Sequence, residues 1–584
     1  MSDKIISLYR DIVAKEKGTL RKDWGGRLSV ALVYPNHYRV GMSSLGFQVI
    51  YSLFNRRSDV VAERAFLPEE QELSLHLGAG KGLLSLESQS PLGKFDIIAF
   101  SLSFENDYPN ILKILQFAKI PIFCEERDES HPIVMAGGIT SFLNPEPLAD
   151  FFDLFLLGEA EANLDLFIGL FRDMVNTRAG RQDLLKTLAR DIKSVYVPSF
   201  YRLEYHKDGT IKSRTPTEKN IPKEITPARD NMQDPRVNRS CILTPDTEFA
   251  DRMLIELGRG CGRSCRFCAA GFVYRPPRFQ KEEDLLACVD ESVKECKQIG
   301  LLSSSVLDTP GIEKISGRII EEGGSFSVSS LRADSFTEGM LEHLKKTGQR
   351  SLAIAPEAGS ERLRGVINKH LTKDQIIDAV RMIARVGDFR IRLYFLIGLP
   401  TENREDVAEI LNLVKSIKHH MIKESRTRGK IGQIQLSVNC FIPKAFTPFQ
   451  WFPMESVPSL KEKQKWLRKA FAREGGVKAN FDVPKYAYVQ SLLSMGNRRV
   501  GSILTLAHKF DHDWSKAFRH SELNPDFFVS RPKGLDEILP WDFIDHGLRK
   551  EYLIKEYRLA LKEQESDICH VGECDRCGVC KLPA

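Results

Sequence analysis

Three features that would assign a protein to a special class are missing from this sequence. No stretch of about eighteen consecutive apolar residues occurs, which argues against a membrane-spanning helix. The opening residues, Met-Ser-Asp-Lys-Ile-Ile-Ser, lack the apolar core of a signal peptide, so we expect a cytoplasmic protein. Neither charge sign is in excess, since 84 basic residues face 78 acidic ones; this balance argues neither for nor against a nucleic-acid partner.

Cysteine is scarce outside two clusters. Clustered cysteines in the cytoplasm, where thiols stay reduced, bind metal more often than they pair as disulfides. With 42% apolar and 28% charged residues, the chain has the composition of a globular protein, and its 584 residues predict several domains. The cysteines outside the clusters are expected to be small buried apolar residues: Cys124, Cys241, Cys288, Cys296 and Cys440.

The first cluster follows an apolar run that predicts a strand. Cys261, Cys265 and Cys268 stand in C-x3-C-x2-C spacing, within a glycine-rich loop whose backbone can fold closely around a ligand. Three thiolates can hold three irons of a [4Fe–4S] cube and leave the fourth iron open. The alternative is a zinc knuckle with a distant fourth ligand, although zinc sites usually use paired C-x2-C knuckles.

This loop resembles the signature loop of the radical S-adenosylmethionine (SAM) superfamily, in which an aromatic residue, here Phe267, precedes the third cysteine. The resemblance implies a cluster whose open iron chelates the amino and carboxylate groups of SAM. Reductive cleavage of the sulfonium then yields a 5′-deoxyadenosyl radical. In such a site the cofactors carry the chemistry, and the protein positions and shields them.

Four apolar runs in the first third of the chain alternate with predicted helices. They span residues 28–36, 95–103, 133–138 and 154–158. This alternation predicts a doubly wound, Rossmann-like parallel sheet with ligand sites at the carboxyl ends of its strands.

The same region resembles the cobalamin-binding domain that precedes many radical SAM modules. The resemblance rests on four motifs: Ser101-x-Ser103, Gly137-Gly138, Asn144-Pro-Glu-Pro147 and Gly158-Glu-Ala-Glu161. The D-x-H-x-x-G loop that supplies a cobalt ligand in part of that family is missing. His37 stands nearest to it, and we expect an ordinary loop histidine there. Cobalamin without a protein ligand and loss of the cofactor both remain open.

Residues 246–455 show short β-rich runs alternating with strongly periodic helices, which predicts a partial (β/α)6 barrel with its working residues at strand carboxyl ends. By resemblance, Ser303, Ser304 and Ser305 face the methionine amino group, and Glu357 faces the ribose hydroxyls. Arg332 and Arg392 are candidates for the methionine carboxylate, because guanidinium pairs with carboxylate in bidentate fashion. The turn at Gly398 resembles the adenine wall of the family. Taken singly, each of these residues could instead form a salt bridge or turn at the barrel mouth.

The second cluster lies in the tail, where Cys569, Cys574, Cys577 and Cys580 stand in C-x4-C-x2-C-x2-C spacing. The run is too compact for the two separated knuckles of most zinc ribbons, and it resembles the ligands of a ferredoxin-type cluster. We expect an auxiliary [4Fe–4S] cluster here, with zinc as the alternative.

As a whole, the chain resembles bacterial radical SAM proteins with an amino-terminal cobalamin-binding-like domain. The expected function is modification of an unreactive carbon, preferably by methyl or methylthio transfer, with an electron donor such as flavodoxin or ferredoxin. The substrate could be RNA, protein or a small molecule. A non-catalytic iron–sulfur or RNA-associated scaffold is the alternative. The expected segments are an amino-terminal helix (1–25), the Rossmann-like domain (26–180), a connector with a hairpin (181–245), the barrel (246–455), a helical extension (456–565) and the metal-binding tail (566–584).

Overall fold

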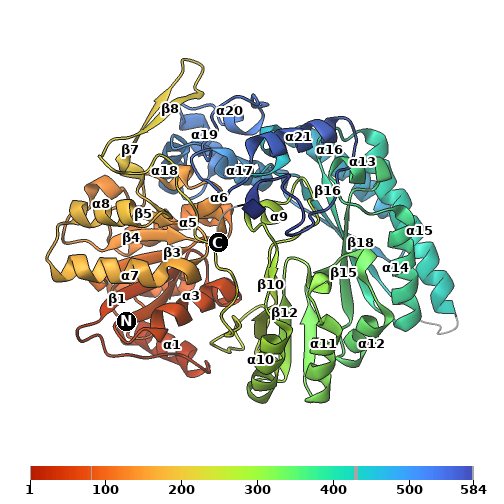
Figure 1. Cartoon of the computed structure of the whole chain (residues 1–584), viewed down its shortest axis with the longest axis horizontal. Helices are drawn as coiled ribbons and strands as arrows, with labels where there is room; N and C mark the ends of the chain where they lie inside the picture. The colour runs from red at the N-terminus through yellow and green to blue at the C-terminus, as the bar shows by residue number, and fades with distance from the viewer. Residues whose placement is uncertain (1, 81, 427–431, 582–584) are drawn as a thin grey trace.

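The computed structural model describes residues 2–80, 82–426 and 432–581. Two α/β halves lie side by side, with the amino-terminal half in red and orange and the second half in green and cyan (Figure 1). The blue carboxyl-terminal helices lie across the top of both halves (Figure 1). One continuous hydrophobic core runs through the two halves and the helices above them. In the described part of the chain, no helix is both long and apolar enough to cross a bilayer.

The amino-terminal half is a six-stranded sheet in the order β2-β1-β3-β4-β5-β6, parallel except at the β5–β6 edge. Helices connect the parallel strands, as in a doubly wound fold. Accordingly, α3 contacts α7, and α1 contacts α4. The strands are β1 (Leu28–Tyr34), β2 (Val60–Phe66), β3 (Ile97–Ser101), β4 (Ile133–Gly137), β5 (Leu154–Leu156) and β6 (Val195–Tyr196); the helices are α1 (Ser2–Ala14), α2 (Tyr38–Met42), α3 (Leu45–Arg56), α4 (Glu70–Ala79), α5 (Tyr108–Phe117), α6 (Ile139–Leu143), α7 (Ala160–Asn176) and α8 (Arg181–Asp191).

The connector contains the hairpin that the sequence predicts. β7 (Tyr201–Tyr205) and β8 (Ile211–Pro216) pair antiparallel around a turn that begins at Lys207. The chain then crosses to the second half in an irregular stretch, from which Arg239 makes a bridge to Ile255 of β9.

The second half contains two parallel sheets, β13-β12-β9 and β14-β15-β16-β17-β18. β13 and β14 follow each other along the chain with only Ser329 between them, so they link the two sheets into one curved wall. β18 comes from the expected helical extension, yet it pairs in parallel with β17 and lengthens the barrel wall. The strands are β9 (Met253–Glu256), β12 (Gln298–Leu302), β13 (Ser325–Val328), β14 (Ser330–Leu331), β15 (Ser351–Glu357), β16 (Arg390–Ile397), β17 (Ile434–Cys440) and β18 (Val477–Phe481), with a small ribbon of β10 (Gly258–Arg259) and β11 (Arg278–Phe279).

Amphipathic helices cover the outside of this wall. α14 shows why they form: a capping box of Thr372 and Gln375 begins it, and its apolar residues recur on one buried face. The helices of the second half are α9 (Ala270–Val273), α10 (Glu282–Glu295), α11 (Ile312–Glu321), α12 (Glu338–Lys346), α13 (Glu361–Val366), α14 (Lys373–Val386) and α15 (Arg404–Ser425); those that follow are α16 (Val457–Phe471), α17 (Pro484–Met495), α18 (Val500–Lys509), α19 (Trp514–His520), α20 (Asp526–Val529) and α21 (Lys550–Leu561).

Candidate active site

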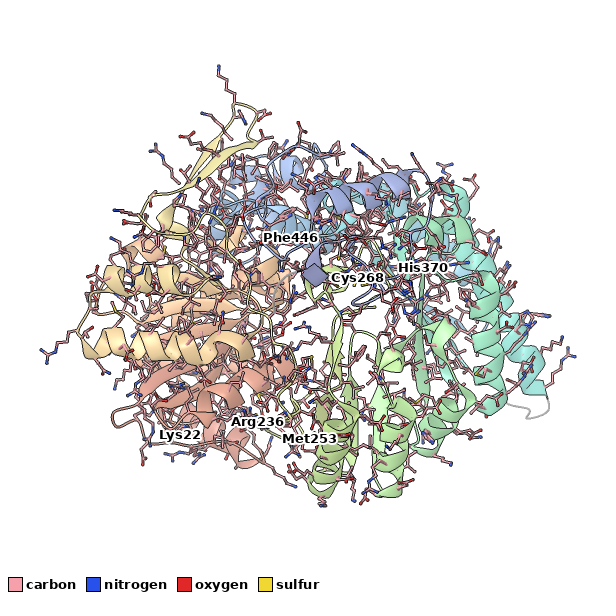
Figure 2. The ribbon with its side chains drawn as sticks, viewed as in Figure 1. Lys22, Arg236, Met253, Cys268, His370 and Phe446 are labelled. Atoms are coloured by element: carbon pink, nitrogen blue, oxygen red, sulfur yellow. The ribbon has the colours of Figure 1, made fainter. Side chains whose placement is uncertain are left out.

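The three-cysteine loop lies where the two halves and the carboxyl-terminal helices meet, and Figure 2 places Cys268 near the centre of the molecule. The loop leaves β10 through Gly260, whose φ of 82° and close approach to the Tyr274 carbonyl leave no room for a Cβ atom. Ser264 also adopts a left-handed φ of 59°. The Cys268 amide donates to the Cys265 carbonyl at 3.1 Å, which closes a tight turn between the second and third cysteines.

Burial governs the ionisation of Cys261 and Cys268. Burial, and then the neighbouring Cys265 thiol, raise the pKa of Cys268 to about 12; burial also raises the pKa of Cys261. In the described residues, no three His, Cys, Asp or Glu side chains converge tightly enough to hold a single metal ion. Two cations, Arg332 and Lys369, lie near the Cys265 thiol. Burial acts to lower the pKa of each, but Asp334 and Glu357 respectively, with a smaller contribution from that thiol, raise it. Three partly buried thiols flanked by two cations fit an anionic iron–sulfur cluster, because iron would bind the thiols as thiolates.

Lys369 is a site residue that sequence reasoning missed. Its ammonium nitrogen lies 3.2 Å from Glu357 Oε1 and 5.9 Å from the centre of the Phe267 ring. It is buried, and Glu357, at the end of β15, adopts a left-handed φ of 66° after a bulge in the strand. Lys369 thus links the expected ribose ligand to the aromatic residue of the cysteine loop. The sequence pattern around Lys369 does not predict this role, because Phe267 comes from a distant segment and Glu357 from the preceding strand.

The three serines after β12 lie in two different environments. Ser303 and Ser304 line the pocket between the two halves, described below. Ser305 is buried, and its hydroxyl donates to Asp308 Oδ2 at 2.7 Å. Asp308 also accepts from Arg263 of the cysteine loop, and these contacts lower the pKa of Asp308 against the opposing effect of burial. Ser305 therefore ties β12 to the cysteine loop, while the other two remain available to a ligand.

The remaining expected SAM contacts do not form one site. Arg332 pairs with Asp334 at 2.9 Å and donates to the Lys369 carbonyl at 3.1 Å. The Gly398 amide donates to Glu402 Oε1 at 2.9 Å, and a Cβ on Gly398 would lie 2.9 Å from the Leu460 side chain. Packing alone therefore accounts for that glycine. Arg392 lies near the amino end of β16 and lines a cavity inside the barrel, away from the strand ends that carry the cysteine loop.

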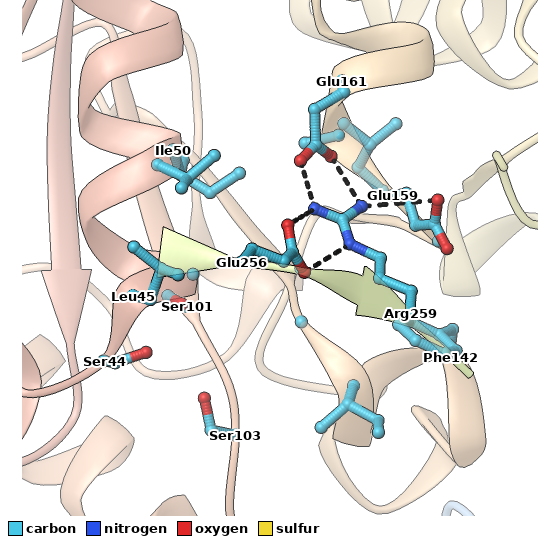
Figure 3. A pocket seen from close by; sticks show the side chains of 18 of the residues that line it. Ser44, Leu45, Ile50, Ser101, Ser103, Phe142, Glu159, Glu161, Glu256 and Arg259 are labelled. Atoms are coloured by element: carbon cyan, nitrogen blue, oxygen red, sulfur yellow. Dashed lines mark hydrogen bonds and ion pairs between the residues drawn. The ribbon is translucent and has the colours of Figure 1, made fainter. Parts of the chain in front are cut away.

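A pocket of about 510 Å³ lies between the two halves. It brings the predicted residues of the first sheet, Ser101 and Ser103 among them, to the same cavity as Ser303 and Ser304. Figure 3 shows Ser44, Ser101 and Ser103 on one side of it. Its lining is mainly apolar, and His37 is not part of it; the His37 ring is hydrogen-bonded to the Leu67 carbonyl at 3.0 Å. Its apolar members include Leu45, Val49, Ile50, Ile139, Phe142, Leu164 and Leu302.

The glycine pair at the end of β4 has a packing role as well. Gly138 has a φ of 102°, and a Cβ there would lie 2.3 Å from the Leu102 carbonyl oxygen. Gly137 is less crowded, with the Leu156 carbonyl at 3.4 Å, and both glycines line the pocket. The pair therefore fits the chain closely against β3 and presents backbone, rather than side chains, to a ligand.

The opposite wall of the pocket is a buried ionic cluster around Arg259 (Figure 3). Arg259 pairs with Glu256 of its own strand region at 2.8 Å and with Glu161 of α7 in the first half at 2.5 Å. Glu159 lies 3.4 Å away and also pairs with Arg278 at 2.7 Å. Burial acts to raise the pKa of Glu161, but Arg259 outweighs it and holds the pKa below its usual range. The cluster joins the two halves at the edge of the pocket.

The tail folds back onto the three-cysteine loop. The Cys569 amide donates to the carbonyl of Gly262, the residue after Cys261, at 2.7 Å. Asn368 binds both Ser264 and Ser566, and the Arg549 amide donates to the Cys577 carbonyl at 2.9 Å. The two cysteine clusters, far apart in sequence, are therefore neighbours in space.

The tail thiols differ in their surroundings. Cys577 is buried, whereas the other three are partly exposed. Burial raises the pKa of Cys569, with Arg275 acting in the opposite direction. Burial also acts to raise the pKa of Cys574, but hydrogen bonds from the Arg576 backbone and side chain outweigh it, and the net pKa is lowered.

Comparisons with known proteins agree with this geometry. The family model "Radical SAM proteins, N-terminal" matches residues 46–198, and the model "Radical SAM superfamily" matches residues 255–414. An uncharacterized protein of Methanocaldococcus jannaschii is 30% identical over 536 residues, which cover 90% of this chain and 99% of that protein. A tRNA-2-methylthio-N(6)-dimethylallyladenosine synthase of Desulforamulus reducens is 24% identical over 206 residues, 31% of this chain and 44% of that enzyme.

Among solved structures, the cobalamin-dependent S-adenosylmethionine radical enzyme OxsB with aqua-cobalamin bound has a TM-score of 0.45 at 14% identity, and the match covers 92% of this chain and 80% of that one. The family models match parts of both halves, and the Methanocaldococcus jannaschii relative matches 90% of the chain. The chain therefore belongs to the radical S-adenosylmethionine superfamily, as an enzyme that uses a [4Fe–4S] cluster and S-adenosylmethionine.

Proposed function

We propose that this radical SAM enzyme transfers a methyl or methylthio group to an unreactive carbon, with cobalamin bound between its two halves. One observation carries the proposal. Ser101 and Ser103, at the carboxyl edge of the first sheet, line the same pocket as Ser303 and Ser304, which follow β12 beside the three-cysteine loop. A cofactor held by the first half would therefore face the SAM site directly.

The residues of this pocket fit a flat, largely apolar cofactor. Its apolar walls suit the faces of a corrin ring, and the backbone at Gly137 and Gly138 can approach closely. The position of His37 supports binding without a histidine ligand below cobalt. A pocket of about 510 Å³ is drug-sized, so the nucleotide tail of cobalamin would need room beyond it.

Each group of residues has a separate task in this proposal. Cys261, Cys265 and Cys268 hold the cluster, and Lys369 positions Glu357 for the ribose hydroxyls. The Arg259 cluster keeps the two halves together and closes one side of the pocket to water. Cobalamin, when bound, supplies a transferable methyl group. The protein thus contributes binding, orientation and exclusion of water.

The tail is proposed to hold a second, fully ligated [4Fe–4S] cluster. Its support is the contact between Cys569 and Gly262, which places the tail cysteines beside the first cluster. A cluster with four protein ligands is closed to SAM, so its task is electron transfer or substrate anchoring. Flavodoxin or ferredoxin in the cytoplasm is the proposed electron donor.

The test is anaerobic reconstitution followed by reduction in the presence of SAM. We expect release of 5′-deoxyadenosine, and its loss in the triple Cys→Ala variant of Cys261, Cys265 and Cys268. Retained cobalamin should show no histidine-nitrogen coupling in the electron paramagnetic resonance spectrum of its Co(II) form. Wild-type cleavage by the triple variant would reject the cluster assignment.

Two further results would change the proposal. Histidine coupling that disappears in His37→Ala would assign the cobalt ligand to His37. Failure to retain cobalamin would reject the cobalamin part of the proposal and leave the radical SAM part. A protein that binds both clusters yet never cleaves SAM would instead be the non-catalytic scaffold. Mass spectrometry of RNA, protein and small molecules from cells with and without the protein would identify the substrate.

A further inference from the structure

The barrel of the second half is hollow. In a closed (β/α)8 barrel the inward positions are filled by bulky branched side chains. Here several lining positions are small on three strands of the wall: Gly300 on β12, Ser325 and Ser327 on β13, and Ala353 and Ala355 on β15. These small residues leave a cavity of about 830 Å³, which lies within the range of ligand pockets.

The charge inside this cavity is unbalanced. Three arginines line it, Arg252, Arg350 and Arg392, and its one lining carboxylate, Glu357, already pairs with Lys369. Within the described residues, these three arginines form no ion pair. A guanidinium in a concave site without a carboxylate partner is well suited to bind an oxyanion, which it can hold through two hydrogen bonds.

Arg252 is positioned for such a ligand. Its Nη1 donates to Ser327 Oγ, whereas its buried Nε has no hydrogen-bond partner in the described structure. A Cβ on Gly300 would lie 3.2 Å from Arg252 Cδ, so the glycine leaves the space that the arginine side chain occupies. A buried donor without a partner is costly, and an oxyanion would satisfy it.

The cavity extends from these arginines toward the SAM site. Arg392 lies five residues before Ile397, the last residue of β16, which is about 17 Å of strand. At the carboxyl end the cavity is lined by Leu302, Glu357 and Asn439, and Leu302 also lines the pocket between the halves. A molecule anchored at the arginines would thus present its far end to the cysteine loop.

We propose that the barrel cavity binds the substrate, an elongated small molecule, through a phosphate or carboxylate group held by Arg252 and Arg392. This inference rests on the proposed function for the identity of the ligand as substrate. It also moves Arg392 from the expected SAM carboxylate to the substrate, because Arg392 lies at the amino end of its strand.

The test is isothermal titration calorimetry of the reconstituted protein with two probes, inorganic pyrophosphate and glutarate, which distinguish phosphate from carboxylate. Arg252→Gln/Arg392→Gln should weaken binding of the preferred probe by at least about tenfold, the effect of losing charge-assisted hydrogen bonds. Arg390→Gln is the matched control, because Arg390 is two residues before Arg392 on the same strand and does not line the cavity. Ala355→Leu, which fills the cavity without changing charge, should weaken binding as well.

Several results would overturn the assignment: no binding of either probe to the wild type, equal losses in the control and the double variant, or unchanged binding in Ala355→Leu. Weaker binding of SAM, but not of the probes, in Arg392→Gln would return that residue to the SAM carboxylate. Because the titration needs no turnover, the two proposals fail separately. A protein that binds the probe but never cleaves SAM would refute only the proposed function.

Discussion

Lys369 is the cation on which the arrangement around Glu357 depends. It is buried between that carboxylate and the Phe267 ring, and Glu357 pulls the pKa of Lys369 upward against the effect of burial. Removing one partner of a buried pair leaves an uncompensated charge, which costs more than the pair itself contributes. Lys369 therefore affects both the stability of the fold and the position of the expected ribose ligand.

We expect Lys369→Met to lower the free energy of unfolding by about 2–3 kcal/mol, because it leaves Glu357 unpaired in a largely buried site. Urea denaturation measures the change. The additional substitution Glu357→Leu should recover part of the loss. The matched control is Lys314→Met, since Lys314 pairs with Glu282 on the surface and should contribute less than about 1 kcal/mol. Equal effects at the two lysines would contradict this account.

His546 predicts a pH dependence of stability. It is buried, its Nε2 lies 2.9 Å from the Phe142 carbonyl, and burial lowers its pKa to about 4. Below about pH 6.5 the unfolded chain binds a proton that the folded chain excludes, so this contribution is complete above pH 6.5 and falls by about 1.4 kcal/mol per pH unit down to about pH 4. Urea midpoints at pH 7 and pH 5 should show the loss.

His546→Gln should flatten this pH dependence, because glutamine can keep the hydrogen bond to Phe142 but does not titrate. His206→Gln, at an exposed histidine, is the control and should leave the dependence unchanged. A dependence that persists in His546→Gln would assign it to other groups.

At the scale of the element, strands with continuous apolar runs were predictable and β2 (Val60–Phe66) was missed. Its centre contains Glu63 and Arg64, which interrupt the apolar run, yet the whole strand is buried. Arg64 pairs with Glu16 and Glu87 at 2.6 Å each, and Glu63 accepts from Trp24 at 2.8 Å. Such a strand depends on partners from distant segments, which hydrophobic periodicity does not reveal.

The candidate site was also only partly predictable from the sequence. The cysteine spacing predicts both clusters, because the proposed ligands of each are close in sequence. It did not predict that Cys569 would bind Gly262, nor that Arg259 and Lys369 would take part, since these contacts join segments that only the folded chain brings together. The expected domain boundary after residue 455 divides strands that pair in the folded chain, because β18 lies beyond the expected barrel and yet pairs with β17.

The tail element has a testable metal content. Because its four cysteines lie beside the first cluster, we expect about eight irons per chain after reconstitution and about four in a variant that lacks residues 566–584. Iron and sulfide analysis measures both. A variant with all four tail cysteines changed to serine is the control, since it keeps the covering segment; it should also hold about four irons. Stoichiometric zinc with unchanged iron would make the tail a structural clip.

For the whole molecule, the Arg259 cluster connects the two halves. Arg259→Met would leave Glu161 and Glu256 close together without their shared cation, and removing one partner from a buried ionic cluster costs about 3–5 kcal/mol. We expect amide hydrogen exchange at least about tenfold faster around both glutamates, measured by mass spectrometry. Arg236→Gln is the control, because Arg236 is exposed and pairs with Asp234 two residues away. Unchanged exchange in Arg259→Met would show that other contacts hold the halves together.

Leu302 lines both the pocket between the halves and the cavity of the barrel. The consequence concerns the exchange of substrate and cofactor. With the substrate in the barrel and the cofactor between the halves, as proposed, Leu302 separates the two ligands, and we infer that neither has to leave for the other to exchange. We expect the rate of cofactor dissociation, measured from the cofactor's absorbance, to be the same with and without saturating pyrophosphate in the barrel. A slower rate with pyrophosphate would show that the two ligands share an exit.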